Sequence, residues 1–191
     1  MKKFLSTIFL AIIINACSNL RMSKDLSHEM FNDNLDVAMI IASQGIDEYP
    51  LWSPDSDYIA VNIEGSWKKI NLKKAVLVDG YWHNKRIGVL NNPKISTLNN
   101  SEEAKFRNST IYGAREVQVS DKFTIKLELK NFSTSLKIFK DGESKVLWST
   151  SMENCHSLSI SPNKKYVAYI CELNGLFVMR IQDDAKKRLI H

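Results

Sequence analysis

Short runs of apolar residues, some continuous and some alternating with polar residues, recur along the chain from residue 37 onward. The run 37–42 is apolar throughout and has the length of a buried strand. Looser alternation returns over 66–72 and 123–129, and Gly, Pro, Asn and Asp residues separate such runs. Segments of this kind are typical of β-strands. The pattern predicts roughly a dozen short strands and almost no helix, so the predicted fold class is all-β.

The most regular segment is a hairpin at 155–171, and a near-copy of it lies at 51–61. Both turns read Ser-Pro-Asx followed by two polar residues. Pro presets φ at the second turn position, Asx suits the third, and the Ser hydroxyl accepts a local backbone hydrogen bond. Ser56 and Lys164 then fall where the chain should take a left-handed φ, which glycine adopts most easily.

A weaker third copy lies at 119–127 and lacks the proline. The first turn serine of the three copies is Ser53, Ser120 or Ser161, so the intervals are 67 and 41 residues. One blade of a β-propeller takes about 40–45 residues. The second interval therefore matches one blade, and the first matches a blade with an insertion.

The segment Trp52–Val61 resembles the core of the TolB-type, WD-like β-propeller repeat, in which Trp-Ser-Pro-Asp-Gly-Lys precedes an aliphatic strand. Ile160–Tyr169 is similar to it, with Ile for Trp and Asn for Asp. The resemblance implies blade-like antiparallel meanders, about three of them over residues 35–191. Known propellers have about four or more blades. We therefore expect a partial or open β-propeller, with a compact β-sandwich as the alternative.

Two Asp-Gly pairs predict further tight hairpins, because this pair suits the positive φ values of a type I′ turn. Asp79–Gly80 lies between the strand-like runs 75–78 and 81–90, and Asp141–Gly142 follows the run 135–140. Residues 91–110 form the longest polar stretch. We expect this stretch to be the inserted loop.

The first residues have the features of a secretion signal. A basic start precedes a mostly apolar run over 4–14, which is short for a membrane span. The segment Ile14–Cys17 resembles the lipobox of bacterial lipoproteins. The resemblance implies that residues 1–16 are a cleaved signal peptide and that Cys17 carries acyl chains, palmitate among them.

Residues 17–34 are polar and mixed, and they are expected to tether the lipid to the β domain. Ser18 stands where an Asp usually signals inner-membrane retention in the lipoproteins of Gram-negative bacteria. The resemblance therefore predicts a protein that is lipid-anchored to the outer membrane on its periplasmic face.

Two further cysteines, Cys155 and Cys171, lie on the strands of the C-terminal hairpin. A three-residue turn at 162–164 pairs Ile160 with Tyr166 and Leu158 with Ala168, and it also places the two cysteines opposite each other. Opposed residues lie within disulfide range, and secretion supplies an oxidising compartment. The register predicts a Cys155–Cys171 disulfide, the alternative being two buried, reduced cysteines.

The formal net charge is +5 at pH 7. Removing the signal peptide leaves 24 basic against 21 acidic side chains, a weak excess that does not indicate nucleic-acid binding. Metalloprotease, hydrolase and phosphate-binding motifs are absent from the sequence, so no enzyme, cofactor or metal site is predicted. Asp55 and Asp57 are interpreted as turn residues.

The most binding-like group in the sequence is Tyr81, Trp82, His83 and Arg86, because aromatic residues together with Arg are typical contact anchors. The alternative is that Trp82 packs inward beside Leu77. The sequence is most consistent with a protein-binding module in an envelope complex, by analogy with TolB-type propellers. The alternative function is an immunity lipoprotein that neutralises a secreted antibacterial toxin.

Overall fold

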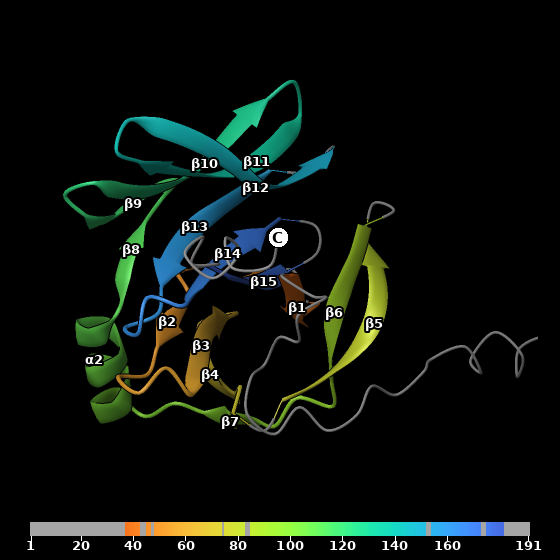
Figure 1. The fold of residues 1–191 in the computed structure, drawn as a ribbon. Helices are drawn as coiled ribbons and strands as arrows, with labels where there is room; N and C mark the ends of the chain where they lie inside the picture. The colour runs from red at the N-terminus through yellow and green to blue at the C-terminus, as the bar shows by residue number, and fades with distance from the viewer. Residues whose placement is uncertain are drawn as a thin grey trace, which may run out of the picture.

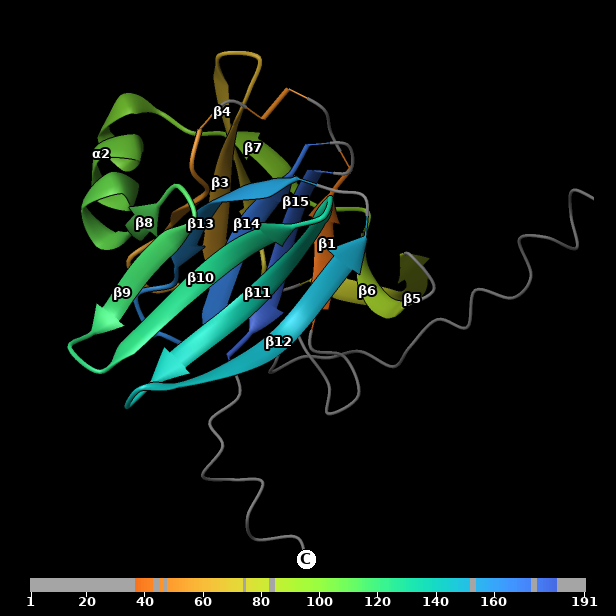
Figure 2. The same cartoon turned by 90° about the horizontal axis from the view of Figure 1, so that it is seen from above.

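The computed structural model describes residues 37–42, 45–46, 48–73, 75–82, 85–151, 154–172 and 175–181. It confirms the all-β fold class, since the chain forms three open β-sheets and only one of its described elements is a helix. The sheets stack face to face in three layers (Figure 1, Figure 2). The predicted signal peptide (1–16), the predicted tether (17–34) and Cys17 lie outside the described residues.

The middle layer is a seven-stranded sheet, which we call the central sheet. Its strands, in order across the sheet, are β5 (Val76–Trp82), β6 (Lys85–Asn91), β1 (Val37–Ile41), β15 (Gly175–Arg180), β14 (Tyr166–Cys171), β13 (Cys155–Ile160) and β8 (Ile111–Gly113). All neighbouring pairs are antiparallel except β1 and β6. The first of the described strands thus lies beside the last, so the two ends of the described domain are joined in one sheet.

Two four-stranded sheets cover the faces of the central sheet. The upper sheet in Figure 1 is a simple meander of β9 (Glu116–Ser120), β10 (Phe123–Lys130), β11 (Ser133–Lys140) and β12 (Glu143–Ser151). The lower sheet contains β2 (Leu51–Trp52), β3 (Tyr58–Ile63), β4 (Ser66–Asn71) and β7 (Ile95–Thr97).

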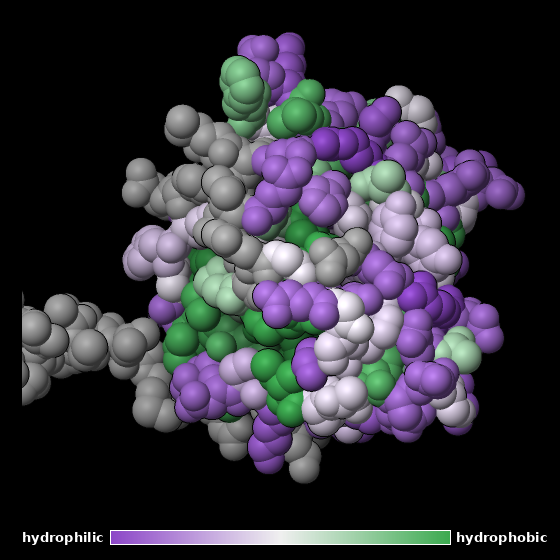
Figure 3. Space-filling view, turned by 180° about the vertical axis from the view of Figure 1, so that it is seen from behind, coloured by the Kyte–Doolittle hydropathy of each residue, from purple (hydrophilic) through white to green (hydrophobic). Residues whose placement is uncertain are grey.

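Two apolar clusters hold the layers together, one on each face of the central sheet. Ile125 and Leu136 of the upper sheet pack in the same cluster as Phe177 of the central sheet. Ile59 of the lower sheet packs in the same cluster as Val178, which follows Phe177 on β15. Because both faces of β14 and β15 are covered, these strands have near-continuous apolar sequences. Seen from behind, the surface is mostly polar, with apolar side chains gathered in one area (Figure 3).

The two Ser-Pro turns have the same geometry, as the sequence predicted. In each, the first serine hydroxyl accepts a hydrogen bond from the N–H of the tyrosine five residues later, at 2.9 Å in the first copy and 3.0 Å in the second. Ser56 and Lys164 adopt the expected left-handed φ, 65° and 58°. The repeated sequence therefore encodes a repeated turn.

The two copies also pack against each other. The N–H of Asn163 donates to Ser56 Oγ at 3.3 Å, and the indole N–H of Trp52 donates to Ser159 Oγ at 3.1 Å. The Trp52 ring also stacks on Tyr166, with 6.1 Å between centroids. Trp52 is fully buried, so this contact is a central link between the lower and central sheets.

The turn of the C-terminal hairpin is one residue longer than predicted. The N–H of Ser161 donates to the carbonyl of Tyr166 at 3.0 Å, which leaves four residues in the turn. Ile160 consequently lies opposite Val167, so the predicted pair with Tyr166 is wrong. The predicted Leu158–Ala168 pair is wrong for the same reason, because Ala168 lies opposite Ser159.

A β-bulge farther along β13 shifts the register back by one residue. The irregularity falls between His156 and Ser159, and Ser157 there has a φ of 57°. The longer turn and the bulge offset each other, so Cys155 lies opposite Cys171 with 4.1 Å between Cα atoms. The predicted disulfide joins them.

The predicted turn at Asp79–Gly80 is wrong, because β5 runs straight through both residues and β6 pairs with it up to Trp82–Lys85. Gly80 is a strand residue, and a Cβ there would lie 2.5 Å from Val89 Cγ2. The other Asp-Gly pair forms the predicted turn, with φ values of 52° at Asp141 and 88° at Gly142. The same Asp-Gly sequence thus forms a turn at 141–142 and part of a strand at 79–80.

The expected loop at 91–110 is also corrected, since it contains β7 and the helix α2 (Asn100–Ser109). Asn99 caps the helix: its side chain accepts from the N–H of Glu102, and the Glu102 side chain accepts from the N–H of Asn99. Phe106 is the buried residue of α2 and packs with Leu51 and Trp67 on the outer face of the lower sheet.

Candidate functional site

The structure separates the four residues that the sequence grouped as binding candidates. Tyr81 is 77% exposed at the end of β5, and Arg86 is exposed on β6 opposite it. Trp82 is only 9% exposed, and His83 lies outside the described residues. Tyr81 and Arg86 are therefore the members of the group that the structure places at the surface.

Trp82 packs inward, but not beside Leu77 as the alternative interpretation had it. Its ring lies 4.1 Å from the Phe177 ring and 4.9 Å from the Trp148 ring, between the central and upper sheets. Leu77 belongs to the cluster on the opposite face of the central sheet. Trp82 thus fixes the end of the β5–β6 hairpin to the core.

Arg86 is held in place by a carboxylate on the neighbouring strand. Its Nη2 donates to both carboxylate oxygens of Asp79, at 2.8 and 2.9 Å. The hydrogen bonds and charge of Asp79 raise the pKa of Arg86. A paired guanidinium of this kind is a defined polar group beside the exposed Tyr81 ring.

A second exposed aromatic residue, which the sequence interpretation missed, lies at the tip of the β10–β11 hairpin. Phe132 is 84% exposed and has a φ of 61°, after Asn131 with a φ of 50°. Lys130 pairs with Ser133, so these two residues form a two-residue turn with positive φ at both positions. Asn suits such a turn, and glycine is the easy choice after it. Phe132 is therefore a bulky side chain in a strained conformation with little burial to offset the strain.

The two hairpins are linked through the edge strand β12. Lys85, at the end of the β5–β6 hairpin, donates from Nζ to the carbonyl of Ser149 and to its Oγ at 3.2 Å. Its ammonium also lies over the Trp148 ring, 5.4 Å from the centroid. Ser149 of β12 lies opposite Ser135 of β11. β11 begins at Ser133, directly after Phe132, so Ser135 is close to the tip of the β10–β11 hairpin.

Exposed aromatic residues thus lie near the ends of two hairpins, β5–β6 and β10–β11, which β12 links. Because side chains alternate along a strand, Tyr81 and its partner Arg86 project from the opposite face of the β5–β6 hairpin to Trp82 and Lys85. We call the exposed ends of the two hairpins, with Tyr81, Lys85, Arg86 and Phe132, the hairpin-tip surface. Exposed aromatic and guanidinium groups on a preorganised scaffold are the usual anchors of protein–protein contacts.

The described residues contain no group of three or more His, Cys, Asp and Glu side chains placed to hold a metal ion. None of the helices that the structure describes is both long enough and apolar enough to cross a membrane. His156, on β13, is partly buried, and its Nδ1 lies 2.8 Å from Ser157 Oγ.

His156 should make stability depend on pH. Burial lowers its pKa; Glu172 opposes this shift, and Arg115 adds to it. The unfolded chain, with a His pKa of about 6.5, then binds more protons than the folded chain at mildly acidic pH. We expect the free energy of unfolding to fall as pH drops below this value. In His156→Gln, the shift of the urea midpoint between neutral and mildly acidic pH should be smaller, and an unchanged shift would contradict this role.

No protein-family model, curated protein or solved structure matches this chain.

Proposed function

We propose that this protein is a lipid-anchored module that binds a protein partner through the hairpin-tip surface. The observation that carries the proposal is the conformation of Phe132. This aromatic residue is exposed and has a left-handed φ, which glycine adopts with less strain. Conformational strain of this kind is typical of sites kept for binding rather than for stability. Tyr81 and the paired Arg86 add a second exposed aromatic ring and a guanidinium group on the β5–β6 hairpin.

The proposed location is the periplasmic face of the outer membrane, with the chain anchored through acylated Cys17. The lipobox-like segment 14–17 and Ser18 support this location. The Cys155–Cys171 disulfide also supports it, because disulfides persist in oxidising compartments. Mass spectrometry tests the anchor: the mature chain should begin at Cys17 and carry lipid, and an intact, unmodified Cys17 would contradict it.

The binding surface is tested by co-purification from cross-linked envelopes. A protein that co-purifies with the wild type should be lost from Tyr81→Ala/Phe132→Ala, because removing central aromatic anchors typically weakens a complex by about 2 kcal/mol or more each. Val146→Ala is the matched control, since Val146 is 53% exposed on β12 of the same sheet. Equal recovery with all three proteins would reject the surface. The identity of the partner, an envelope component or a toxin, would separate the two functions that the sequence suggested.

Phe132→Gly should increase stability while weakening binding. Glycine adopts a left-handed φ without the strain that Phe132 has there. Removing this strain should raise the free energy of unfolding by roughly 1 kcal/mol. Urea denaturation at constant pH measures this change. Phe132→Ala is the control, because it removes the ring but keeps a Cβ at the same φ. A loss of stability in Phe132→Gly would mean that the ring is retained for the fold and not for a partner.

A further inference from the structure

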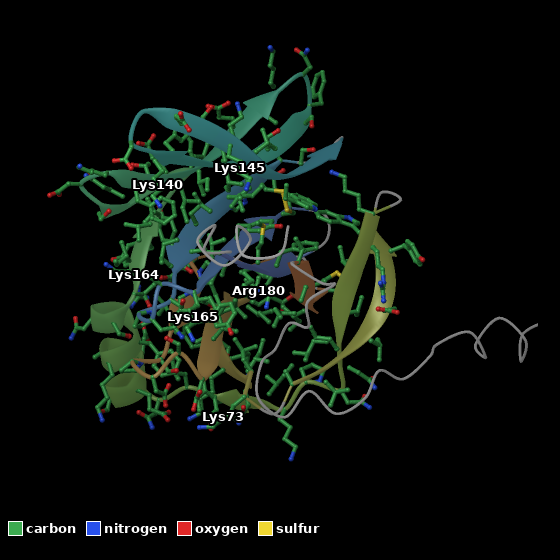
Figure 4. All side chains as sticks on the ribbon, in the orientation of Figure 1. Lys73, Lys140, Lys145, Lys164, Lys165 and Arg180 are labelled. Atoms are coloured by element: carbon green, nitrogen blue, oxygen red, sulfur yellow. A yellow bond between two sulfur atoms is a disulfide. The ribbon has the colours of Figure 1, made fainter. Side chains whose placement is uncertain are left out.

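A second surface feature lies on the side of the molecule that faces the viewer in Figure 4. Lys140 and Lys145 come from the upper sheet, Lys164 and Lys165 from the turn between β13 and β14, and Arg180 from β15 of the central sheet (Figure 4). We call these five residues the basic face. Lys164 and Lys165 belong to the second Ser-Pro turn, and Arg180 lies opposite Tyr166, which directly follows that turn.

Other cationic side chains at this end of the molecule form ion pairs with carboxylates, whereas three lysines of the basic face do not. Lys73 pairs with Asp57 at 2.8 Å, and Lys122 lies 3.9 Å from Asp141. No ion pair among the described residues includes Lys140, Lys164 or Lys165, and all three are exposed. Lys164 Nζ donates to a backbone carbonyl, that of Val119, at 3.4 Å, which leaves its charge uncompensated. Three carboxylates lie on neighbouring turns and strand ends, those of Asp55, Asp121 and Glu143, and Glu143 is the strand partner of Lys140. None of the described ion pairs joins them to these lysines.

The chain enters the domain at this same face. Val37, the first residue of β1, lies opposite Met179, the residue before Arg180. Cys17 stands 20 positions earlier in the sequence. A segment of that length reaches at most about 70 Å when fully extended. A lipid on Cys17 would therefore keep the start of β1, which lies beside the end of β15, within about 70 Å of a membrane.

We propose that the basic face docks on the anionic phospholipid surface of the membrane that carries the anchor. This inference rests on the proposed lipid anchor at Cys17. Each lysine near an anionic bilayer raises the affinity of a protein for that bilayer about fivefold. The lipid tether also makes the contact intramolecular, which favours it further. Lipid is favoured as the occupant because the start of β1, which follows the proposed anchor in the sequence, and the uncompensated lysines lie at the same end of the domain.

Docking would also orient the molecule. Phe132 directly precedes β11 and Lys140 is its last residue, and eight residues of antiparallel strand span about 27 Å. With Lys140 at the lipid surface, Phe132 would point away from it. The membrane contact and the proposed protein contact would then use different ends of the same sheet.

Lysine footprinting on vesicles tests this orientation. The purified, lipidated mature protein is reconstituted into vesicles of phosphatidylcholine, with or without roughly 30% phosphatidylglycerol. It is acetylated briefly, and each lysine is quantified by mass spectrometry. We expect labelling at Lys140, Lys164 and Lys165 to be several-fold slower on the anionic vesicles. Labelling should recover at about 0.5 M NaCl, where charges are screened within about 4 Å.

Exposed lysines elsewhere provide internal controls. Lys105 on α2 and Lys130 at the far end of β10 should be labelled equally on both vesicles. Uniform slowing of every lysine, or no slowing at the basic face, would overturn the inference. Slow labelling in whole envelopes but not on vesicles would assign the face to an acidic protein instead of lipid. The double charge reversal Lys164→Glu/Lys165→Glu should abolish the difference between the two vesicles.

The intact mass of the same sample separates the two proposals. A chain without lipid on Cys17 would contradict the proposed anchor itself. A lipidated chain with fully reactive Lys164 and Lys165 on anionic vesicles would leave the anchor standing and overturn only the docking face.

Discussion

Trp52→Ala should cause the largest loss of stability of any substitution considered for this protein, about 3–5 kcal/mol in the free energy of unfolding. The side chain is fully buried, stacks on Tyr166 and donates its indole N–H to Ser159 Oγ. Its backbone N–H also donates to Thr110 Oγ1 at 2.7 Å, which joins β2 to the segment after α2. Removing the ring leaves a cavity between the lower and central sheets, and urea denaturation measures the effect.

Ser159→Ala is the matched control for this result. It keeps the ring of Trp52 but removes its hydrogen-bond acceptor, so we expect a smaller loss of about 1–3 kcal/mol. If Trp52→Ala costs less than about 1 kcal/mol, the packing of the two Ser-Pro hairpins is not the link between these layers.

The double variant Cys155→Ala/Cys171→Ala should lose up to about 3 kcal/mol of stability, because the disulfide closes a loop of moderate length and both sulfurs are fully buried. For a domain of this size, a loss of that magnitude lowers Tm by roughly 6–12 °C. Differential scanning calorimetry, under conditions that keep the wild type oxidised, gives the shift.

The single variants Cys155→Ala and Cys171→Ala should each lose about as much stability as the double variant, since either change removes the same bond. Unreduced, denatured wild type should contain no reactive thiol from this pair. Detection of two reactive thiols, or losses that add up across the two single variants, would contradict a disulfide.

Features encoded within a few neighbouring residues were the ones predicted correctly. The Ser-Pro-Asx sequence contains the proline φ and the serine acceptor that define its turn, so the left-handed φ of Ser56 and Lys164 could be predicted. The disulfide prediction was correct although the predicted register of the hairpin contained two errors. The turn was predicted one residue too short, and the bulge near Ser157 was not predicted, but these two errors offset each other.

Features set by distant packing were missed. The pairing of β5 with β6 keeps the chain extended through Asp79–Gly80, and a side chain at Gly80 would clash with Val89. Nothing local indicates that β1 lies beside β15 or that β8 completes the central sheet. For α2 a signal was present: Asn99 followed by Glu102 is a capping box, but the surrounding polar residues favoured a loop.

The candidate site was predicted in part. Tyr81 and Arg86 lie at the surface as expected, but the sequence grouped them with Trp82, which the structure places in the core. Phe132 was missed because Asn131–Phe132 is not one of the usual turn pairs, so the hairpin tip could be located only from the register of β10 and β11.

Site-specific photo-crosslinking tests the proposed binding surface most directly. A benzophenone amino acid in place of Phe132 should give a discrete protein adduct in living cells, and Tyr81 should give the same adduct. Tyr112 is the control, because it is 47% exposed but lies on β8, away from the hairpin-tip surface (Figure 2). Adducts at Phe132 and Tyr81 but not at Tyr112 are the predicted result. No adduct at either tip position, or the same adducts at all three positions, would contradict the account.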